Sequence, residues 1–244
     1  MNATLPAPPT PAAPAPPRVR LALHYAVAGD LRFLSHHDEL RLLSRALVRA
    51  RWPLAFSQGF NPLPQATIAQ PRPVGLASEC QLALVELVPG SPIPSGDALA
   101  AVLPADCRLR CVRGVTDRLA YHAEIATYEL PLTAAQVAAL PPAAAALLAR
   151  PSILITRPGG PGKRARPIEL RPFIEDIAFE GVVLRLRLRI TQTGSARPVE
   201  VLQELEPNLK EQSHRVRLVT IAWDREPAGP VYWTAASQEG HTLG

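Results

Sequence analysis

The chain has 244 residues, which is room for one large domain or for two smaller domains of roughly 100 residues each. Hydrophobic residues make up 47% of the chain and charged residues 19%, so a wholly disordered or fibrous protein is excluded. Lys and Arg outnumber Asp and Glu by 26 to 21, and this mildly basic balance favours an acidic partner such as nucleic acid without requiring one.

The N-terminal segment and the longest apolar stretch bear on location. Residues 1–17 are rich in Pro and Ala, which predicts a disordered tether, and they lack the features of a signal peptide. The apolar stretch 134–149 is interrupted and shorter than the roughly 20 residues that a bilayer requires. We therefore expect a cytoplasmic protein with no membrane span. Three cysteines are too few for a disulfide framework.

The elements expected in the first half of the chain follow from periodicity and capping signals. Alternating apolar residues from 18 to 27 predict a half-buried strand. Ser35 and Asp38 have capping-box spacing and open a helix that runs to about residue 51. The remaining segments read as three extended pieces, a short helix and a strand: residues 54–57, 65–69, 81–88, 95–103 and 107–112.

The second half repeats this order. Residues 124–132 predict a strand, and Thr133 can cap an Ala-rich helix at 134–149. Extended segments follow at 152–157, 168–173 and 182–190, with 174–179 as a continuation of the second of these. Ser195 can cap a helix that starts at Pro198, and residues 216–223 form the last strand.

This repeated order predicts an α+β protein of two tandem ferredoxin-like domains, each a split βαβ unit with a mostly antiparallel sheet. The first domain covers residues 18–118 and the second covers 119–224. Residues 225–244 are rich in Gly, Pro and polar residues, which predicts a flexible tail.

Basic residues gather on the faces that such domains leave uncovered. Arg185, Arg187 and Arg189 alternate with apolar residues in the strand 182–190, so they form a ladder on the side opposite the core. A glycine-rich hairpin loop adds three more cations: Lys163, Arg164 and Arg166. Guanidinium rows on an open sheet face suit phosphate groups. Because aromatic residues make up only 5% of the chain, we expect RNA to be bound mainly through phosphate and shape.

Few residues point to catalysis or to a cofactor. His36 and His37 have only Asp38 nearby, whereas metal sites need three or four convergent ligands. The chain has no complete P-loop and no dinucleotide-binding motif. We therefore predict no metal site, no cofactor and no catalytic activity of the protein's own, with His36 as the one candidate for a general base on a ribose hydroxyl.

Several segments together resemble the radical SAM-linked protein family, a domain-of-unknown-function family. The segments that carry this resemblance are Gly29 to His36, the helix end Arg45 to Ala50, Ser57 to Pro62 and Pro73 to Glu79, and more weakly Lys163 to Arg171 and Arg197 to Leu202. Members are fused to, or encoded beside, cobalamin-type radical SAM enzymes. The resemblance therefore implies a radical SAM enzyme as partner and no established activity of the domain itself.

The chain departs from the family pattern at four positions of the first half. Leu63 and Gln65 stand where relatives tend to have a His and a basic residue, and Leu84 stands where they have an Asp. His37 occupies a position that is usually apolar. These departures argue against acid–base chemistry at the loop. The residues that remain, suited to holding a ligand, are Arg32, His36, Gln58, Gly59, Phe60 and Asn61.

We therefore expect a non-catalytic accessory protein that binds RNA or presents it to a radical SAM enzyme, with the loop at 57–62 as the specific site. Two alternatives stay open. The element order also resembles that of CRISPR repeat-processing endonucleases, so the protein would be a metal-independent endoribonuclease that uses His36. The other alternative is a protein-interaction module that docks on the radical SAM enzyme without nucleic acid.

Overall fold

The computed structural model describes residues 19–159, 162 and 164–235. The expected tether at 1–17, Lys163 and the last part of the expected tail, 236–244, lie outside the described residues. Within the described part of the chain, no helix is long and apolar enough to cross a membrane.

The first half contains four strands and two α-helices. In chain order they are β1 (Arg20–Val27), the 3-10 helix η1 (Gly29–Phe33), α1 (His36–Arg49), β2 (Ala66–Ile68), β3 (Ala77–Glu86), α2 (Gly96–Ala100) and β4 (Cys107–Val115). The side chain of Ser35 accepts a hydrogen bond from the backbone N–H of Asp38 at 3.2 Å, which confirms the predicted cap. The extended piece expected at 54–57 is reduced to isolated bridges at Leu54 and Phe56.

The second half repeats the helix–strand alternation with an added hairpin. Its elements are β5 (Ala123–Pro131), α3 (Ala134–Ala149), β6 (Leu154–Arg157), β7 (Arg166–Glu169), η2 (Arg171–Phe173), β8 (Ile174–Glu180), β9 (Val183–Thr191), β10 (Gly194–Ser195), α4 (Pro198–Leu205), η3 (Pro207–Arg215) and β11 (Arg217–Trp223). Thr133 and Gln136 form the capping box of α3. The cap of α4 is Arg197, and not Ser195 as predicted.

One prediction about this half is wrong. The strand that pairs with β9 is β8, at 174–180, whereas the segment around 168–173 forms β7 and η2. β7 pairs instead with β6 in a separate two-stranded sheet. Apolar residues continue through both segments, so their periodicity does not separate them; the separating signal is Pro172 at their junction, which has no backbone N–H to donate to a strand partner.

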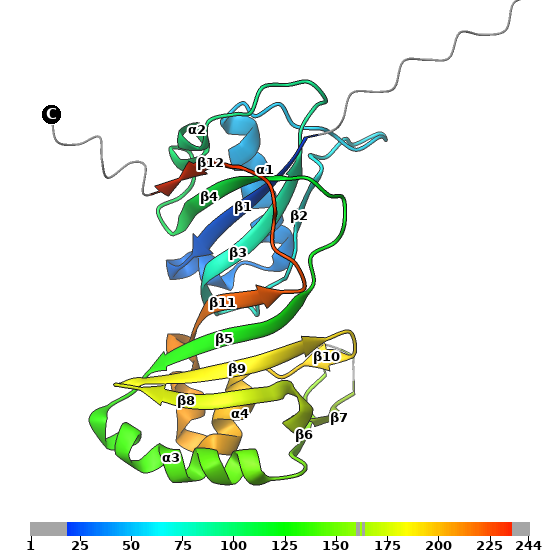
Figure 1. The fold of residues 1–244 in the computed structure, drawn as a ribbon. Helices are drawn as coiled ribbons and strands as arrows, with labels where there is room; N and C mark the ends of the chain where they lie inside the picture. The colour runs from blue at the N-terminus through cyan, green and yellow to red at the C-terminus, as the bar shows by residue number, and fades with distance from the viewer. Residues whose placement is uncertain (1–18, 160–161, 163, 236–244) are drawn as a thin grey trace, which may run out of the picture.

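The fold is α+β, with a large mixed sheet that runs through both halves (Figure 1). The strand order is β4-β1-β3-β2 in the first half and β11-β5-β9-β8 in the second. The halves meet where β11 pairs with β3, in the one parallel pairing among the described strands, with Arg217 opposite Ala77 and Leu218 opposite Ser78. In Figure 1, α1 lies behind the upper strands and α4 behind the lower ones.

Each half has its own hydrophobic core between sheet and helices. In the first half, Tyr25 of β1 and Leu47 of α1 belong to the same buried cluster. In the second half, Leu130 and Leu186 of the sheet pack in a cluster that also contains Leu202 of α4. The alternation predicted for β9 is confirmed, because its leucines are buried while Arg187 is exposed.

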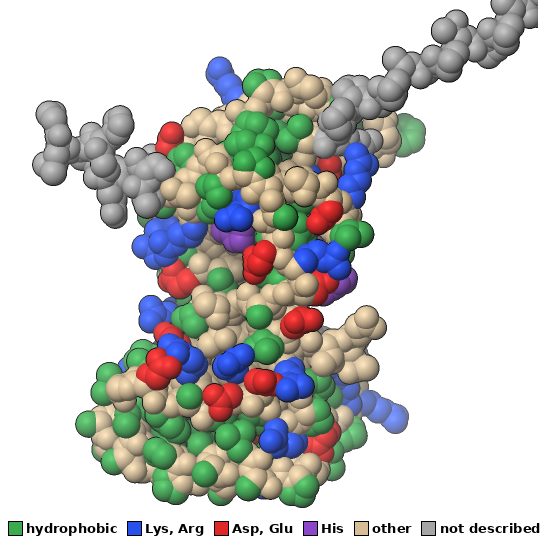
Figure 2. All heavy atoms as spheres, viewed as in Figure 1, with side chains coloured by type: hydrophobic (Ala, Val, Ile, Leu, Met, Phe, Trp, Pro, Cys, Tyr) green, Lys and Arg blue, Asp and Glu red, His purple; other side chains and the backbone are tan. Residues whose placement is uncertain are grey.

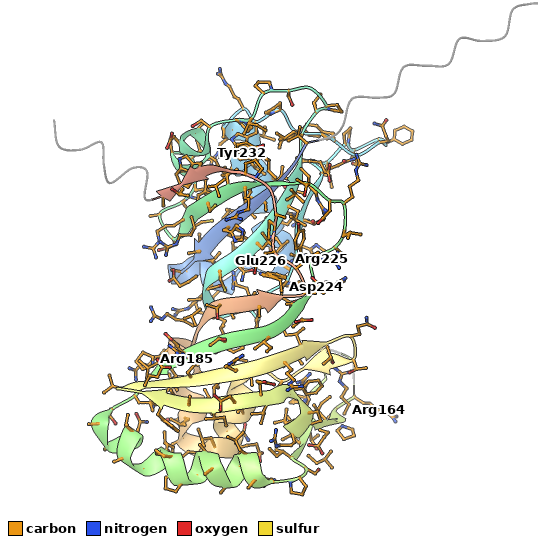
Figure 3. All side chains as sticks on the ribbon, viewed as in Figure 1. Arg164, Arg185, Asp224, Arg225, Glu226 and Tyr232 are labelled. Atoms are coloured by element: carbon orange, nitrogen blue, oxygen red, sulfur yellow. The ribbon has the colours of Figure 1, made fainter. Side chains whose placement is uncertain are left out.

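The segment expected as a flexible tail forms structure over much of its described length. Residues Val231–Thr234 form β12, which pairs antiparallel with β4 at the edge of the first half. On the way there, the backbone N–H of Asp224 donates to the carbonyl of His122 at 2.9 Å. Figures 1 and 3 show this segment crossing from the junction, near Asp224, to Tyr232 on the upper strands. The prediction missed it because the segment that leads into β12, with Gly229 between Pro227 and Pro230, has no strand periodicity.

Candidate functional site

The arginine ladder of β9 lies on the solvent face of the sheet, but carboxylates compensate much of its charge. Arg185 Nη2 lies 2.8 Å from Glu129 Oε1 of β5, and its Nη1 also pairs with Glu180. Arg189 pairs with Glu175 of β8. The Arg187 guanidinium makes no hydrogen bond or ion pair within the described part of the chain. Carboxylates therefore compensate the charge at two of the ladder's three positions, Arg185 and Arg189.

Two arginines of the first half also have a carboxylate partner. Arg110 and Arg108 on β4 share Glu79 of β3 as their partner. Figure 2 shows Lys/Arg and Asp/Glu side chains interspersed across this face of the second half. The mixture follows from the antiparallel pairing, which places charged residues of neighbouring strands opposite one another. Residues far apart in the sequence are involved, so the sequence pattern of one strand could not reveal it.

The hairpin loop lies away from the ladder. Arg164 and Arg166 are exposed at the end of the β6–β7 hairpin, and Figure 3 shows Arg164 and Arg185 on opposite sides of the second half. Lys163 lies outside the described residues. The predicted cations of this half therefore do not form one continuous row.

The loop at 57–62 is a closed structure at the C-terminal side of α1. The backbone N–H of Ser57 donates to the carbonyl of Leu63 at 2.9 Å, and the Leu63 N–H donates to Ser57 Oγ at 3.0 Å. Gly59 has a φ of +144°, a conformation that favours glycine. Phe60 is fully exposed, at 107% of its reference surface, and Gln58 and Asn61 are exposed beside it.

The structure separates this loop from the other predicted site residues. Arg32 and His36 lie at the N-terminal end of α1, and the loop follows its C-terminal end, about 20 Å of helix away. His36 is half-buried, and its Nδ1 atom is buried without a hydrogen-bond partner among the described residues. The structure therefore does not assemble a single site from the first-half motif residues.

A cleft of about 810 Å³ lies between the two halves. Its lining comes from η1 and the segment 70–76 of the first half, and from β5, β11 and the segment 194–199 of the second. Tyr128 and Leu218 line the cleft and also belong to the second core, so the cleft opens on the helix-covered side of the sheet. The cleft thus brings together segments that are far apart in the sequence.

The charged side chains that line the cleft are arginines. Arg72, Arg157 and Arg197 line it together with His214, and no Asp or Glu among the described residues does. Arg72 and Arg157 are neutralised by carboxylates behind the wall. The Arg197 guanidinium has no hydrogen bond or ion pair within the described part of the chain, and His214 is held only by Nδ1, 2.9 Å from the carbonyl of Glu211.

Phe33 stands at the first-half wall of the cleft. It is 55% exposed, and the Arg32 guanidinium carbon lies 4.8 Å from the centre of its ring. The backbone N–H of Gly75 donates to the carbonyl of Arg32 at 2.8 Å, and a side chain at Gly75 would lie against the ring. Phe33 is thus an exposed aromatic whose backbone is held in place on both sides.

Arg72 is the group that holds this wall together. Its guanidinium donates to the carbonyl oxygens of Leu31, at 2.7 Å, and of Leu76, at 3.1 Å, and also to that of Arg32. Glu39 of α1 compensates the charge from behind and accepts a hydrogen bond from Tyr25 Oη at 2.8 Å. Burial and the Glu39 charge raise the pKa of Tyr25 well above its ordinary value, so this hydroxyl remains a donor.

Arg157 holds the opposite wall. Its Nε and Nη2 atoms donate to the two carboxylate oxygens of Glu200 at 2.6 and 2.7 Å, and Nη2 also donates to the carbonyl of Ser195 at 2.9 Å. Glu200 in turn accepts from the backbone N–H of Arg197 at 2.8 Å. This bidentate pair fixes the start of α4, where Arg197 enters the cleft wall.

Sequence reasoning missed the cleft and the residues that build it: Glu39, Arg72, Arg157, Glu200 and His214. A signal existed for part of it, because the resemblance included residues 73–79 and 197–202. Within the described part of the chain, no three potential metal ligands cluster. Burial raises the pKa of Cys107 to about 12 and of Cys80 to about 11, so neither is an activated thiol.

Comparison with protein families identifies one that matches the chain. No curated protein matches it. A family model described as an uncharacterized protein conserved in bacteria matches residues 20–199, which include Phe33, Arg72, Arg157 and Arg197 of the cleft. His214 lies beyond the matched range. Because the match covers well over half of the chain, the protein belongs to the uncharacterized bacterial family DUF2344.

Proposed function

We propose that the protein binds single-stranded RNA in the cleft between its halves and presents it to an enzyme partner, without catalysing a reaction itself. The observation that carries the proposal is the lining of the cleft, which includes Arg197 and His214 and no carboxylate among the described residues. Phosphate is the group that such a lining suits, because guanidinium binds it through paired hydrogen bonds.

The cleft is a better phosphate site than the open sheet face. On that face Arg185 and Arg189 already have carboxylate partners, and phosphate would have to displace them. In the cleft the carboxylates of Glu39 and Glu200 lie behind the wall, where they hold Arg72 and Arg157 in place. The Arg197 guanidinium has no such partner and is available to a ligand.

The proposed architecture is that of two ferredoxin-like units that lie side by side in one continuous sheet, with the cleft where they adjoin. Its support is the repeated strand order, β4-β1-β3-β2 and β11-β5-β9-β8, in which the first strand of each half lies between the third and the fourth. Helices cover one face of each unit, and the cleft forms where the two covered faces adjoin.

The proposed partner is a radical SAM enzyme, and the proposed location is the cytoplasm. The support for the partner is the resemblance of Gly29–His36, Ser57–Pro62 and Pro73–Glu79 to radical SAM-linked proteins. An accessory role agrees with the position of His36, which does not line the cleft. A general base has to reach the proton that it removes, so this position does not favour the endoribonuclease alternative.

Binding of a short single-stranded oligouridylate, followed by fluorescence anisotropy, tests the proposal. We expect affinity to fall steeply between about 50 and about 200 mM salt, because phosphate contacts release counterions. Arg197→Glu should weaken binding about tenfold or more, since a charge-assisted contact is lost and a repulsive charge is added. Arg187→Glu, on the open face, is the matched control and should bind as the wild type does. Salt-independent binding, or equal losses in the two variants, would refute the proposal.

A further inference from the structure

We infer that the cleft holds an unpaired nucleotide unit, with its base stacked on Phe33 and its phosphate bound by Arg197 and His214. This inference rests on the proposed function and names the substrate class: a single-stranded segment whose base leaves the stack, and not a duplex. The two parts of the inference depend on different walls of the cleft. Phe33 comes from the first half, and Arg197 and His214 come from the second.

Phe33 has the properties of a stacking surface. More than half of its surface is exposed, although it lies in a cleft beside the apolar residues Val74 and Leu76. The Arg32 guanidinium lies over one face of the ring, so a base would stack on the other face of the ring or on the guanidinium itself. Its backbone is held before any ligand arrives, because Arg72 and Gly75 both bond to the carbonyl of Arg32.

Arg197 and His214 supply a contact to the phosphate, which stacking of the base on Phe33 does not provide. Base stacking tolerates every base, so affinity for a nucleotide needs a second contact to the phosphate. Arg197 offers an unpartnered fork of donors, and His214 has Nε2 remaining as a second donor or acceptor, since its Nδ1 contacts the carbonyl of Glu211. The other two arginines of the lining have buried carboxylate partners, so they shape the wall.

The size of the cleft limits the ligand. Its volume of about 810 Å³ falls in the range of about 300 to 1,000 Å³ that is typical of sites for small molecules and cofactors. A site of this size accommodates one or two nucleotide units. It does not accommodate a double helix, whose bases are in any case paired and unavailable for stacking.

The test compares three probes and four variants. The probes are a short oligouridylate, a ribose-phosphate strand of the same length without bases, and uridine monophosphate. Phe33→Leu removes the aromatic ring, and Arg197→Gln removes the cation. The matched controls are Phe60→Leu and Arg187→Gln, which change a more exposed aromatic and an equally unpaired arginine outside the cleft.

We expect Phe33→Leu to weaken oligouridylate binding by about 5- to 100-fold, with an unchanged salt dependence, because a neutral stacking contact is lost. The strand without bases should bind Phe33→Leu and the wild type equally. Arg197→Gln should instead reduce the slope of log affinity against log salt by about 0.7, the value for one phosphate contact of a single strand. Both controls should resemble the wild type.

The outcomes separate this inference from the proposed function. If Arg197→Gln weakens RNA binding while Phe33→Leu does not, RNA binding stands and the nucleotide site is refuted. If Phe33→Leu weakens binding of the strand without bases as well, its role is structural and the stacking inference is refuted. If uridine monophosphate binds as tightly as the oligouridylate, the ligand is a free nucleotide and the RNA proposal is refuted. If the wild type binds none of the three probes, both are refuted.

Discussion

Arg72 Nε lies 3.0 Å from Glu39 Oε2, and the two side chains are almost completely buried, with 1% and 5% of their surfaces exposed. This ion pair connects α1 to the wall of the cleft, because the same guanidinium also binds the carbonyl oxygens of Leu31 and Leu76. The pair thus links the first core to the position of Phe33. Stability of the first half and the shape of the cleft depend on the same contact.

Glu39→Gln should lower the free energy of unfolding by about 3 to 5 kcal/mol, because it leaves the Arg72 guanidinium buried without a compensating charge. Arg41→Gln is the control, since the pair that Arg41 makes with Asp38 on the same helix is exposed. We expect that variant to unfold almost as the wild type does. Urea denaturation measures both changes, and similar losses in the two variants would contradict the prediction.

Arg157→Lys should destabilise the second half although it keeps the charge. The lysine cannot form the two parallel bonds to Glu200 or reach Ser195 at the same time, and we expect a loss of about 1 to 3 kcal/mol. Arg150→Lys provides the comparison, because its pair with Glu204 is partly exposed and has one hydrogen bond, at 3.2 Å. Thermal unfolding followed by circular dichroism distinguishes them. Equal melting temperatures for both variants would show that the bidentate geometry is unimportant.

Gly229→Ala should loosen the C-terminal segment. A methyl group at Gly229 would collide with the backbone carbonyl of Gly114, and backbone atoms cannot move aside as a side chain can. We expect a loss of about 1 to 3 kcal/mol, the usual cost of overpacking. Limited proteolysis measures the effect. Cleavage near β12 should be faster in Gly229→Ala than in the control Ala228→Ser, which changes an exposed neighbour. Cleavage at the wild-type rate would show that β12 does not depend on this contact.

His24 should make stability depend on pH in the weakly acidic range. Burial, with a smaller effect of Arg113, lowers its pKa below the ordinary value. Below its ordinary pKa of about 6.5 the unfolded chain binds a proton that the folded protein does not, so stability falls as pH decreases through this range. His24→Gln should lessen the fall, as measured by urea denaturation at a series of pH values. If the free energy of unfolding falls with pH at the same slope in the wild type and in His24→Gln, His24 is not the source of the pH dependence.

Local sequence patterns determined most of the secondary structure. Alternation predicted β1 and β9, and short-range capping pairs at Ser35 and Thr133 predicted the starts of α1 and α3. These signals are reliable because strand alternation and helix capping depend on residues close together in the chain. They fail at β12, where pairing with β4 and the close contact of Gly229 with Gly114 decide the structure.

The sequence also determined which residues carry charge, but only the tertiary structure decided which charges remain available. A strand pattern reveals that Arg185 and Arg189 face solvent, whereas their neutralisation depends on Glu129 and Glu175 of neighbouring strands. Arg197 reads as one surface arginine among many until the fold places it opposite Phe33 across a cleft. The physical reason is that side-chain direction is a local property of the backbone, whereas electrostatic compensation and concavity depend on contacts between segments distant in sequence.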